Sequence, residues 1–249
     1  MMNVWVCTAT YNEDANVRVL IPEVFSVVPE AQLVVVDDAS PDGTGQRVDE
    51  MARRNPRIHP IHRPGRLGYA SAHRQAMGYV LDHGGEAVVT MDADLSHSPA
   101  HVPELLRALE GADVAIGSRY VSGAGTRNWP WNRRLLSRTA NALARLGLGL
   151  KVRDCTSGFR AYRGTVLRGL RLERFRSEGY CFLEELLLAC HLAGAKMAEV
   201  PITFAERRAG RSKMSLGVIA EGGAMLAKLS CYRVFARDRT SRRLLRDNP

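Results

Sequence analysis

The sequence has no apolar run that approaches the about 20 residues needed to span a membrane. It contains no internal repeat and no low-complexity tract, which excludes solenoid and fibrous folds. No secretory signal precedes the first apolar segment, so we expect a cytoplasmic protein. The cysteines stand apart, without a Cys-x-x-Cys pair, at positions 7, 155, 181, 190 and 231. This spacing predicts reduced thiols rather than disulfides or a zinc site.

Aromatic residues are scarce, at 6% of the chain, whereas basic residues are in excess and give a net charge of +9. Seven Lys and Arg but only two Asp follow residue 227, so the C-terminal end carries more than half of that excess. Such a cluster can bind nucleic acid, bind an anionic membrane or serve solubility. Nucleic-acid binding favours basic residues interleaved with aromatic ones on one surface, which this composition lacks. We keep a nucleic-acid-binding module only as a remote alternative and expect no nucleic-acid partner.

Strand patterns alternate with helical patterns through the first 120 residues. Strands are predicted at 4–8, 32–38, 57–62, 86–91 and 112–116. Helices are predicted between them at 17–28, 46–54, 67–81 and from Pro99 onward, and Thr44 is expected to cap the second. Alternation of this kind predicts an α/β fold with a mostly parallel, Rossmann-like sheet flanked by helices.

The pattern loosens after residue 120. A long helix is predicted at 133–150, a polar segment at 153–162, a helix at 179–193 and a strand at 196–205 that Pro201 makes an edge strand. A basic loop and a further helical pattern at 214–235 follow. We expect one domain at 1–213. Residues 214–249 form an amphipathic helix and basic tail, either part of that domain or a membrane-docking extension.

Two of the predicted strands end in acidic residues. Asp37 and Asp38 follow one strand, and Asp92 and Asp94 follow another. The carboxyl ends of parallel strands meet at one edge of an open α/β sheet, where such sheets bind ligands. Carboxylate oxygens in an Asp-x-Asp pair suit Mg²⁺ or Mn²⁺, which in proteins commonly bridge to substrate phosphates. The sequence therefore predicts one phosphate-handling site at this edge.

Six motifs in a fixed order carry a resemblance that covers residues 4–216. They are the runs at 10–13, 36–44, 91–97, 117–120, 157–160 and 199–204 (TYNE, VDDASPDGT, MDADLSH, GSRY, SGFR and EVPITF). Together they resemble the inverting family-2 glycosyltransferases of GT-A fold, and most closely the dolichyl- and polyprenyl-phosphate mannose synthases. The resemblance implies a membrane-associated enzyme with Mg²⁺ or Mn²⁺ as cofactor, a nucleotide-sugar donor such as GDP-mannose and polyprenyl phosphate as acceptor. It also implies a β-linked product. Because a polyprenyl acceptor lies in a bilayer, we expect a peripheral enzyme at the cytoplasmic face of a membrane, and a membrane-spanning partner subunit is the alternative to direct docking.

The resemblance also gives roles to individual residues. The positions that match donor-nucleotide contacts are Ala9, Tyr11, Glu13, Val36, Asp38, Asp92, Ala93 and Asp94. Asp92 and Asp94 match the metal-binding pair. The positions that match acceptor-phosphate contacts are Arg119, Arg133, Ser137, Arg207 and Lys213. Asp94, Arg119, Arg207 and Lys213 are the expected catalytic residues.

A phosphate acceptor fits the residue types. Departure of the sugar builds negative charge on the diphosphate, which a divalent metal and Arg or Lys can stabilise. A sugar hydroxyl would need a carboxylate base, whereas a phosphate monoester with a second pKa of about 6 is already largely dianionic near neutrality. Arginine is abundant and binds phosphate oxygens with a planar fork.

Departures from the family pattern leave alternatives open. Ala9 replaces a usual proline, and the runs at 67–72 and 183–185 differ from the usual Gly-Leu-Gly-Thr-Ala and Gln-x-Glu. The alternatives are another donor, UDP-glucose or UDP-HexNAc, and a saccharide or natural-product acceptor. Among the remaining residues, Glu185 is expected on a helix surface and His97 outside the metal shell. For membrane contact, the candidates are the helix at 214–235 with its tail and the tryptophans at 129 and 131.

Overall fold

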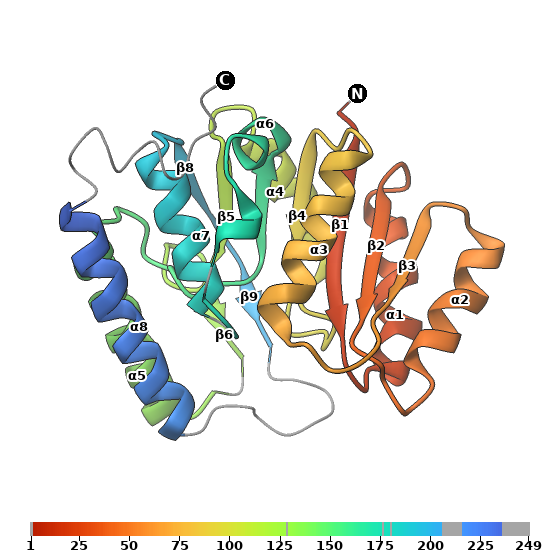
Figure 1. Cartoon of the computed structure of the whole chain (residues 1–249), viewed down its shortest axis with the longest axis horizontal. Helices are drawn as coiled ribbons and strands as arrows, with labels where there is room; N and C mark the ends of the chain where they lie inside the picture. Colours follow the sequence, from red (N-terminus) through yellow and green to blue (C-terminus); the bar gives the residue numbers. More distant parts are fainter. Residues whose placement is uncertain (1, 128, 176, 180, 206–215, 236–249) are drawn as a thin grey trace.

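A seven-stranded sheet forms the centre of the protein (Figure 1). The computed structural model describes residues 2–127, 129–175, 177–179, 181–205 and 216–235, and only the helical backbone at 216–221, 232, 234 and 235. Within these residues the strand order is β3-β2-β1-β4-β7-β5-β8. The strands are β1 (Val4–Thr10), β2 (Gln32–Asp37), β3 (Ile58–His62), β4 (Ala87–Thr90), β5 (Val114–Ser118), β7 (Arg160–Arg163) and β8 (Met197–Pro201). A pair of two-residue strands, β6 (Gly125–Thr126) and β9 (Thr203–Phe204), forms a separate ribbon.

Both faces of the sheet are covered, which accounts for the unbroken apolar strands. Successive side chains of one strand enter opposite cores: Trp5 and Cys7 pack in one cluster, and Val4 and Val6 in the other. The first core lies under α3 (Tyr69–Asp82), α6 (Gly164–Arg168) and α7 (Cys181–Leu192), and the second under α1 (Asp14–Val27), α2 (Thr44–Arg54) and α4 (Val102–Ala108). Two single turns, η1 (Pro99–His101) and η2 (Leu172–Arg174), complete the core region. In Figure 1, α3 and α7 lie in front of the sheet.

The predicted mostly parallel sheet flanked by helices is confirmed, and one of its strands is antiparallel. All neighbouring strands of the sheet run parallel except β7, which is antiparallel to both β4 and β5. The sequence pattern at 153–162 did not predict this strand. Pro201 ends β8 at the sheet edge, as predicted, because proline cannot donate to a further ladder.

Two long helices lie side by side at one end of the molecule, on the left in Figure 1. They are α5 (Trp131–Leu148) and α8 (Leu216–Phe235), which contact each other, and α8 also contacts α7. Both helices match helical patterns in the sequence. Among the described helices, none is both long and apolar enough to cross a membrane.

Candidate active site

The loops after three adjacent parallel strands hold strained backbone. Asn12, Ala39 and Leu95 adopt the left-handed conformation with φ of 60°, 55° and 62°. They follow β1, β2 and β4, whose carboxyl ends point to the same side of the sheet (Figure 1). Non-glycine residues adopt this conformation at an energetic cost, and such strain gathers at functional sites. The strained residues therefore lie at the same edge of the sheet at which the acidic motifs predict a site.

The loops after β1 and β2 are joined by side chains. The backbone N–H groups of Asn12, Glu13 and Asp14 donate to Ser40 Oγ, Thr44 Oγ1 and Asp42 Oδ2, at 3.0, 2.9 and 3.1 Å. The expected capping role of Thr44 is therefore wrong: α2 begins at Thr44 itself, after Gly43, and the Thr44 hydroxyl serves the start of α1. This arrangement fixes the first loop against the second.

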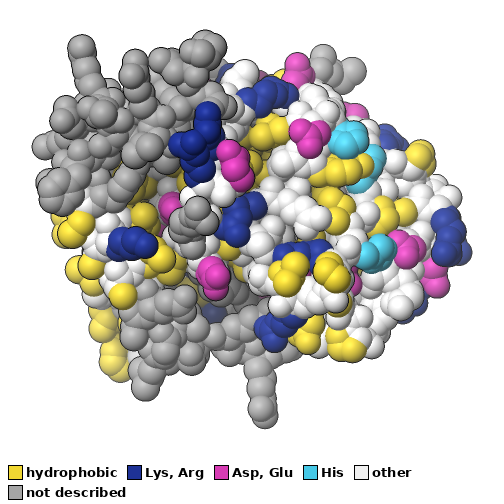
Figure 2. Space-filling view, viewed as in Figure 1, with side chains coloured by type: hydrophobic (Ala, Val, Ile, Leu, Met, Phe, Trp, Pro, Cys, Tyr) yellow, Lys and Arg dark blue, Asp and Glu magenta, His cyan; other side chains and the backbone are white. Residues whose placement is uncertain are grey.

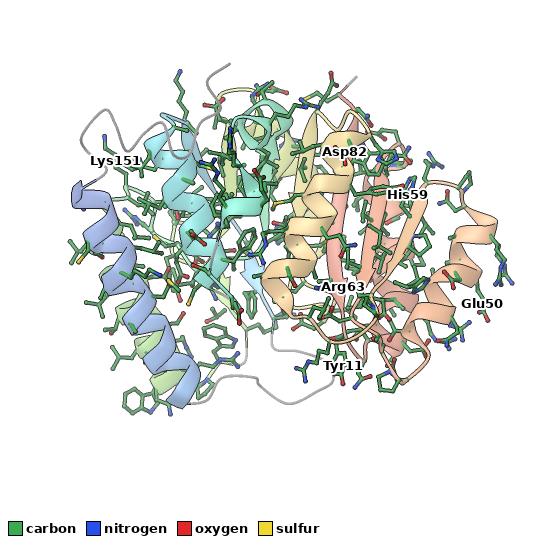
Figure 3. The ribbon with its side chains drawn as sticks, viewed as in Figure 1. Tyr11, Glu50, His59, Arg63, Asp82 and Lys151 are labelled. Atoms are coloured by element: carbon green, nitrogen blue, oxygen red, sulfur yellow. The ribbon has the colours of Figure 1, made fainter. Side chains whose placement is uncertain are left out.

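Asp38 is held from two sides. Arg63 pairs with Asp38 Oδ1 at 2.7 Å, and the Gly68 backbone N–H donates to Asp38 Oδ2 at 2.8 Å. Both partners of the ion pair are buried. Nearby, the guanidinium of Arg66 lies 4.3 Å from the centre of the Tyr11 ring. Figure 3 labels Tyr11 and Arg63 in the lower part of the view, toward which β1 and β2 point. The contact between Arg66 and Tyr11 places the loop at 63–68 beside the position expected for the nucleoside.

The Asp92–Asp94 pair lies beside this loop. The Tyr69 hydroxyl donates to Asp92 Oδ1 at 3.3 Å, and Asp94 Oδ1 accepts from the Ser96 backbone N–H at 3.0 Å. Gly68 contacts Asp38 and its neighbour Tyr69 contacts Asp92, so two consecutive residues connect the acids of the two strands. The structure therefore brings the two acidic ends together at the edge of the sheet.

Two buried histidines, His73 and His97, lie near the carboxylates, and burial lowers the pKa of both. Burial lowers the pKa of His73 to about 4, although the nearby Asp92 opposes the shift. Burial also lowers the pKa of His97, against the carboxylates of Asp92 and Asp94. His97 Nδ1 accepts from the Asp92 backbone N–H at 3.1 Å, and its ring stacks on Phe159. His97 thus fixes the backbone of the acidic turn, and its place outside the metal shell stays a prediction.

The donor atoms at this turn suit a hard cation. Carboxylate oxygens of Asp92 and Asp94 are of the type that Mg²⁺ and Mn²⁺ prefer. Among the described residues, no three His, Cys, Asp or Glu side chains converge on one point. A metal held by two carboxylates and by the phosphates of a substrate needs no such protein cage. The residues present therefore fit a metal that is shared with a nucleotide.

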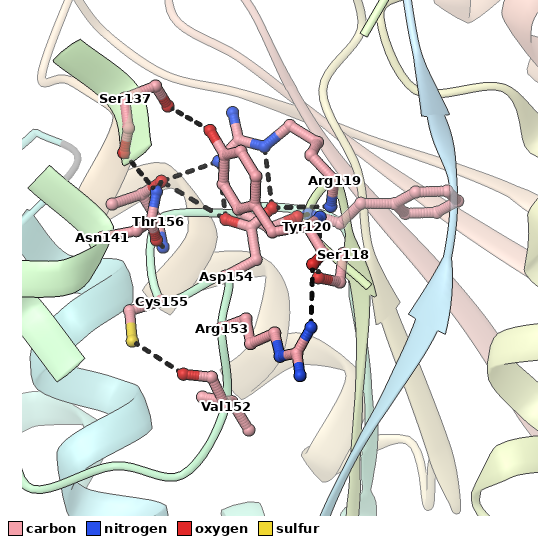
Figure 4. Close-up of polar contacts among 12 residues, drawn as sticks. Ser118, Arg119, Tyr120, Ser137, Asn141, Val152, Arg153, Asp154, Cys155 and Thr156 are labelled. Atoms are coloured by element: carbon pink, nitrogen blue, oxygen red, sulfur yellow. Dashed lines mark hydrogen bonds and ion pairs between the residues drawn. The ribbon is translucent and has the colours of Figure 1, made fainter. Parts of the chain in front are cut away.

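Arg119 forms the centre of a buried polar network on the other side of the acidic turn (Figure 4). Its Nε and Nη2 donate to the two carboxylate oxygens of Asp154 at 2.7 and 2.6 Å, and Nη2 also donates to Thr156 Oγ1 at 2.7 Å. Burial alone would lower the pKa of Arg119, but the charge and hydrogen bonds of Asp154, together with Tyr120 and Asp92, give a net upward shift. The rings of Tyr120, Trp129 and Phe204 lie within 5.4 to 5.7 Å of the guanidinium carbon. Arg119 is thus a fixed cation.

The same network reaches helix α5. The Tyr120 hydroxyl donates to Ser137 Oγ at 2.6 Å, and Asn141 Nδ2 donates to Thr156 Oγ1 at 3.0 Å. Arg133, one helical turn before Ser137, has its guanidinium carbon 4.2 Å from the centre of the Trp129 ring. The predicted acceptor residues Arg119, Arg133 and Ser137 are therefore connected through shared neighbours.

The remaining predicted positions differ in their exposure and in their hydrogen bonds. Ala9 is half-buried, whereas Val36 and Ala93 are buried, and Val36 exposes no surface to a donor. The Glu13 carboxylate accepts from Asn16 at 2.5 Å. Arg207 and Lys213 lie outside the described residues.

A second buried arginine supports the segment that contains Asp154. Arg160 is fully buried and donates to the backbone oxygens of Leu183 and Cys155, at 2.7 and 2.6 Å. Burial raises the pKa of Glu184 to about 7, although Arg160 opposes the shift. Glu185 Oε2 accepts from the Ser177 backbone N–H at 2.9 Å. Instead of lying free on a helix surface, Glu185 fixes a loop.

Sequence reasoning missed four residues of the site. Arg63 has no recognisable motif, because only the fold brings it to Asp38. Tyr69 lies in the run at 67–72 that departs from the family pattern, and that departure was the available indication. Asp154 and Thr156 lie in a polar segment three and one residues before the SGFR motif, which could have directed attention to them.

Comparison with known proteins supports one family. The model of glycosyl transferase family 2 matches residues 5–171. A polyprenol monophosphomannose synthase from Mycolicibacterium smegmatis is 45% identical over 87% of this chain and 82% of its own length. An undecaprenyl-phosphate mannosyltransferase from Micrococcus luteus is 40% identical over 88% and 90%.

A solved structure has the same fold. Glucosyl-3-phosphoglycerate synthase from Mycobacterium tuberculosis, in complex with Mn²⁺, UDP-glucose and phosphoglyceric acid, aligns with a TM-score of 0.67. The alignment covers 92% of this chain and 80% of that one, at 21% identity. The family match covers the acidic turn, Arg119 and every strand of the sheet except β8. This chain therefore belongs to glycosyl transferase family 2.

Proposed function

We propose that this glycosyltransferase transfers mannose from GDP-mannose to a polyprenyl phosphate, with inversion at the sugar carbon. The observation that carries the proposal is the 45% and 40% identity, over 87% and 88% of the chain, to enzymes named for polyprenol-phosphate and undecaprenyl-phosphate mannose transfer. The geometry supports it on both sides, because the chain supplies an acidic turn at Asp92 and Asp94 and a fixed arginine network around Arg119, close enough for Asp92 to raise the pKa of Arg119. The donor side comprises Tyr11, Asp38, Asp92 and Asp94.

The acceptor side favours a phosphate over a hydroxyl. Arg119 is permanently charged and held in place by Asp154 and Thr156, so it can bind an anion without reorganising. Arg133 and Ser137 add a cation and a hydroxyl from α5, one helical turn apart. A phosphate oxygen attacks the sugar carbon as the bond to the donor diphosphate breaks, and the electron pair leaves with that diphosphate. No proton has to be removed from a dianionic acceptor.

Asp92 and Asp94 are the residues that would hold Mg²⁺ or Mn²⁺. Such an ion would neutralise the charge that develops on the departing diphosphate. Hydrogen bonds within the protein position the two carboxylates. The Tyr69 hydroxyl donates to Asp92, and the Asp94 carboxylate accepts from the backbone N–H of Ser96 in the same turn. The catalytic set that we propose is Asp94, Arg119, Arg207 and Lys213.

The lipid acceptor requires that the protein reach a membrane surface. We propose a peripheral enzyme at the cytoplasmic face, with a GT-A domain at 1–213 and residues 214–249 as its C-terminal extension. A membrane-spanning partner subunit would offer a second means of attachment. The alternatives of a UDP-sugar donor or a saccharide acceptor are separated by the experiment below.

The test is a panel of radiolabelled donors with one acceptor. GDP-mannose, UDP-glucose and UDP-N-acetylglucosamine are each incubated with a water-soluble, short-chain polyprenyl phosphate, and transfer into the acceptor is counted. We expect transfer from GDP-mannose alone. Faster transfer from a UDP-sugar, or transfer only to a saccharide, would replace the proposal with that alternative.

The product has a predicted linkage. Direct displacement turns an α-linked donor into a β-linked mannosyl phosphate, because the attack comes from the face opposite the leaving diphosphate. The one-bond carbon–hydrogen coupling at the anomeric position, measured by NMR, distinguishes the two anomers. An α-linked product would contradict the single displacement.

Gly158 is predicted to leave the space that the Tyr69 hydroxyl needs to reach Asp92 on the donor side of the site. A Cβ at this position would lie 2.7 Å from the Tyr69 hydroxyl and 3.5 Å from Asp92 Oδ1. We expect Gly158→Ala to displace the hydroxyl from Asp92 and to lower kcat/KM for the donor about 10- to 100-fold, the loss of one hydrogen bond to a charged group. Tyr69→Phe removes the same bond without the clash.

The two changes are therefore expected to be non-additive: the double variant loses about as much kcat/KM as either single variant. Gly78→Ala is the matched control, because nothing lies within 4 Å of a Cβ at that position. If the double variant instead loses the product of the two single effects, Gly158 does not act through Tyr69.

A further inference from the structure

Trp129 is buried, yet its indole N–H has no hydrogen-bond partner. The residue is 5% exposed, and its Nε1 atom is buried without an acceptor among the described residues. Buried tryptophans usually pair this N–H, because an unpaired buried donor keeps the full cost of its desolvation. A native protein that retains such a donor often uses it for a ligand or an ion. The surroundings of Trp129 decide whether a ligand is the reason here.

The ring of Trp129 lies under two arginines of the acceptor side. The guanidinium carbon of Arg133 is 4.2 Å from the centre of the ring, and that of Arg119 is 5.7 Å from it. The negative face of an indole ring attracts such cations. Since Nε1 belongs to this same ring, an anion that both guanidiniums hold lies next to the unpaired N–H. A phosphate group suits this arrangement, because its oxygens carry charge for the arginines and lone pairs for the indole.

Aromatic contacts fix the ring relative to the acidic turn. Trp129 meets the Phe204 ring edge to face, with the ring centres 5.3 Å apart, and Phe204 meets His97 in the same way at 5.3 Å. His97 in turn accepts from the Asp92 backbone N–H. On the other side, Arg134 Nε donates to the backbone oxygen of Trp129 at 3.1 Å. The indole is therefore held in one place between the acidic turn and the start of α5.

Two predicted membrane contacts face the protein instead. Trp129 is buried, and in α8 Leu229 is buried while Met225 and Leu226 pack against the core. The prediction of membrane contact is therefore wrong for Trp129, and these α8 side chains face the protein. The basic tail at 236–249 lies outside the described residues.

We propose that the Trp129 indole N–H donates a hydrogen bond to the phosphate of the acceptor, beside Arg119 and Arg133. This inference rests on the proposed function, whose acceptor is a phosphate monoester. The two arginines supply charge, and the indole adds a neutral donor of fixed direction. Because the ring is already fixed, the bond forms without reorganisation of the protein. Trp129 is then an acceptor-binding residue in addition to the predicted set.

Trp5 shows why the two arginines matter to this inference. It is 4% exposed, and its Nε1 is also buried and unpaired among the described residues. However, Trp5 lies near the amino end of β1, and its ring neighbours include His59 at 4.9 Å and His83 at 6.0 Å. Figure 3 labels His59 in the upper part of the view, and Figure 2 shows histidine side chains at the upper right of the same view. The strand ends of the site point the other way, so Trp5 is the matched control.

The experiment measures binding of farnesyl phosphate to the full chain by titration calorimetry, without donor. Trp129→Phe keeps an aromatic ring but removes the N–H, and we expect it to weaken binding about 10- to 100-fold, the loss of one hydrogen bond to a charged group. Trp5→Phe should bind farnesyl phosphate as the unchanged protein does. In the transfer assay, Trp129→Phe should raise KM for the acceptor by a similar factor and leave KM for the donor unchanged.

The melting temperature separates this role from a structural one. Both variants lose the same ring volume, and neither is expected to lose a hydrogen bond within the protein, so their melting temperatures should fall by similar amounts. A larger fall for Trp129→Phe would show that the N–H is bonded inside the protein and would overturn the inference. Unchanged affinity of Trp129→Phe for farnesyl phosphate, or an equal rise in KM for both substrates, would also overturn it.

The two proposals fail in different ways. If Trp129→Phe weakens farnesyl phosphate binding but the unchanged protein transfers no mannose, the proposed function fails and the role of Trp129 stands. If mannose is transferred and Trp129→Phe binds farnesyl phosphate normally, only the role of Trp129 fails. Absence of farnesyl phosphate binding by the unchanged protein would overturn both.

Discussion

Asp94→Asn is expected to lower kcat for mannosyl transfer about 100- to 1,000-fold, which corresponds to roughly 3 to 4 kcal/mol of lost transition-state stabilisation. Asparagine keeps the shape of Asp94 and can still accept the bond from the Ser96 N–H, but it removes the charge that would hold a divalent metal. Because the fold around the turn is kept, the melting temperature should change little. The transfer rate and the melting temperature are measured on the same preparation.

A chelator should have the same effect as the substitution. Excess EDTA is expected to abolish transfer, and added Mg²⁺ or Mn²⁺ should restore it in the unchanged protein but not in Asp94→Asn. Asp82→Asn is the control: Asp82 is exposed at the end of α3, away from the site (Figure 3). Full activity in excess chelator would refute the metal-dependent mechanism.

Two of the strands that form the site were predictable as its acidic part, because each is an apolar run that ends in aspartates. β2 and β4 follow this pattern closely, and the parallel arrangement of the sheet then brings their ends to one edge. β7 was not predictable in this way, because it begins with Arg160, a charged residue that normally excludes a buried strand. Arg160 is tolerated there because backbone oxygens from two separate segments accept its hydrogen bonds. No local pattern contains that information.

The site also combines residues that sequence motifs predict with residues that only the fold brings together. The acidic pair and Arg119 follow from motifs, whereas the side chains that fix them come from distant parts of the chain. Arg63 reaches Asp38 across 25 positions, and Asp154 reaches Arg119 across 35. Helix α5 is a further case. Its leucines predict a helix, but the pattern does not tell which side the protein covers, and the structure shows that most of them face outward.

Asp154→Asn is expected to destabilise the protein by about 3 to 5 kcal/mol, the usual cost of removing one partner of a buried ion pair. The Asp154 side chain is 0% exposed and accepts from the backbone N–H, Nε and Nη2 of Arg119. An asparagine would turn an amide N–H₂ group toward the guanidinium and leave a buried positive charge uncompensated. Urea denaturation measures the change in the free energy of unfolding.

The matched control is Glu50→Gln, because Glu50 also pairs with an arginine, Arg47, but is half-exposed. Exposed pairs contribute about 0 to 1 kcal/mol, so this control should unfold almost as the unchanged protein does. A loss at Asp154 no larger than the loss at Glu50 would show that the buried pair does not stabilise this fold.

A milder change at the same arginine separates stability from positioning. Thr156→Ala removes one acceptor of Arg119 Nη2 and the bond from Asn141, but keeps the ion pair with Asp154. We expect a loss of only about 1 kcal/mol in stability, together with a rise in KM for the polyprenyl phosphate, because the guanidinium is less well fixed where the acceptor phosphate binds. KM for the donor should stay unchanged, since among the described residues no donor-side residue forms a hydrogen bond with Thr156.

Thr156→Ser is the control, because it keeps the hydroxyl and should restore the KM for the acceptor. If Thr156→Ala raises the KM of both substrates equally, the network supports the fold in general and does not position Arg119 for the acceptor.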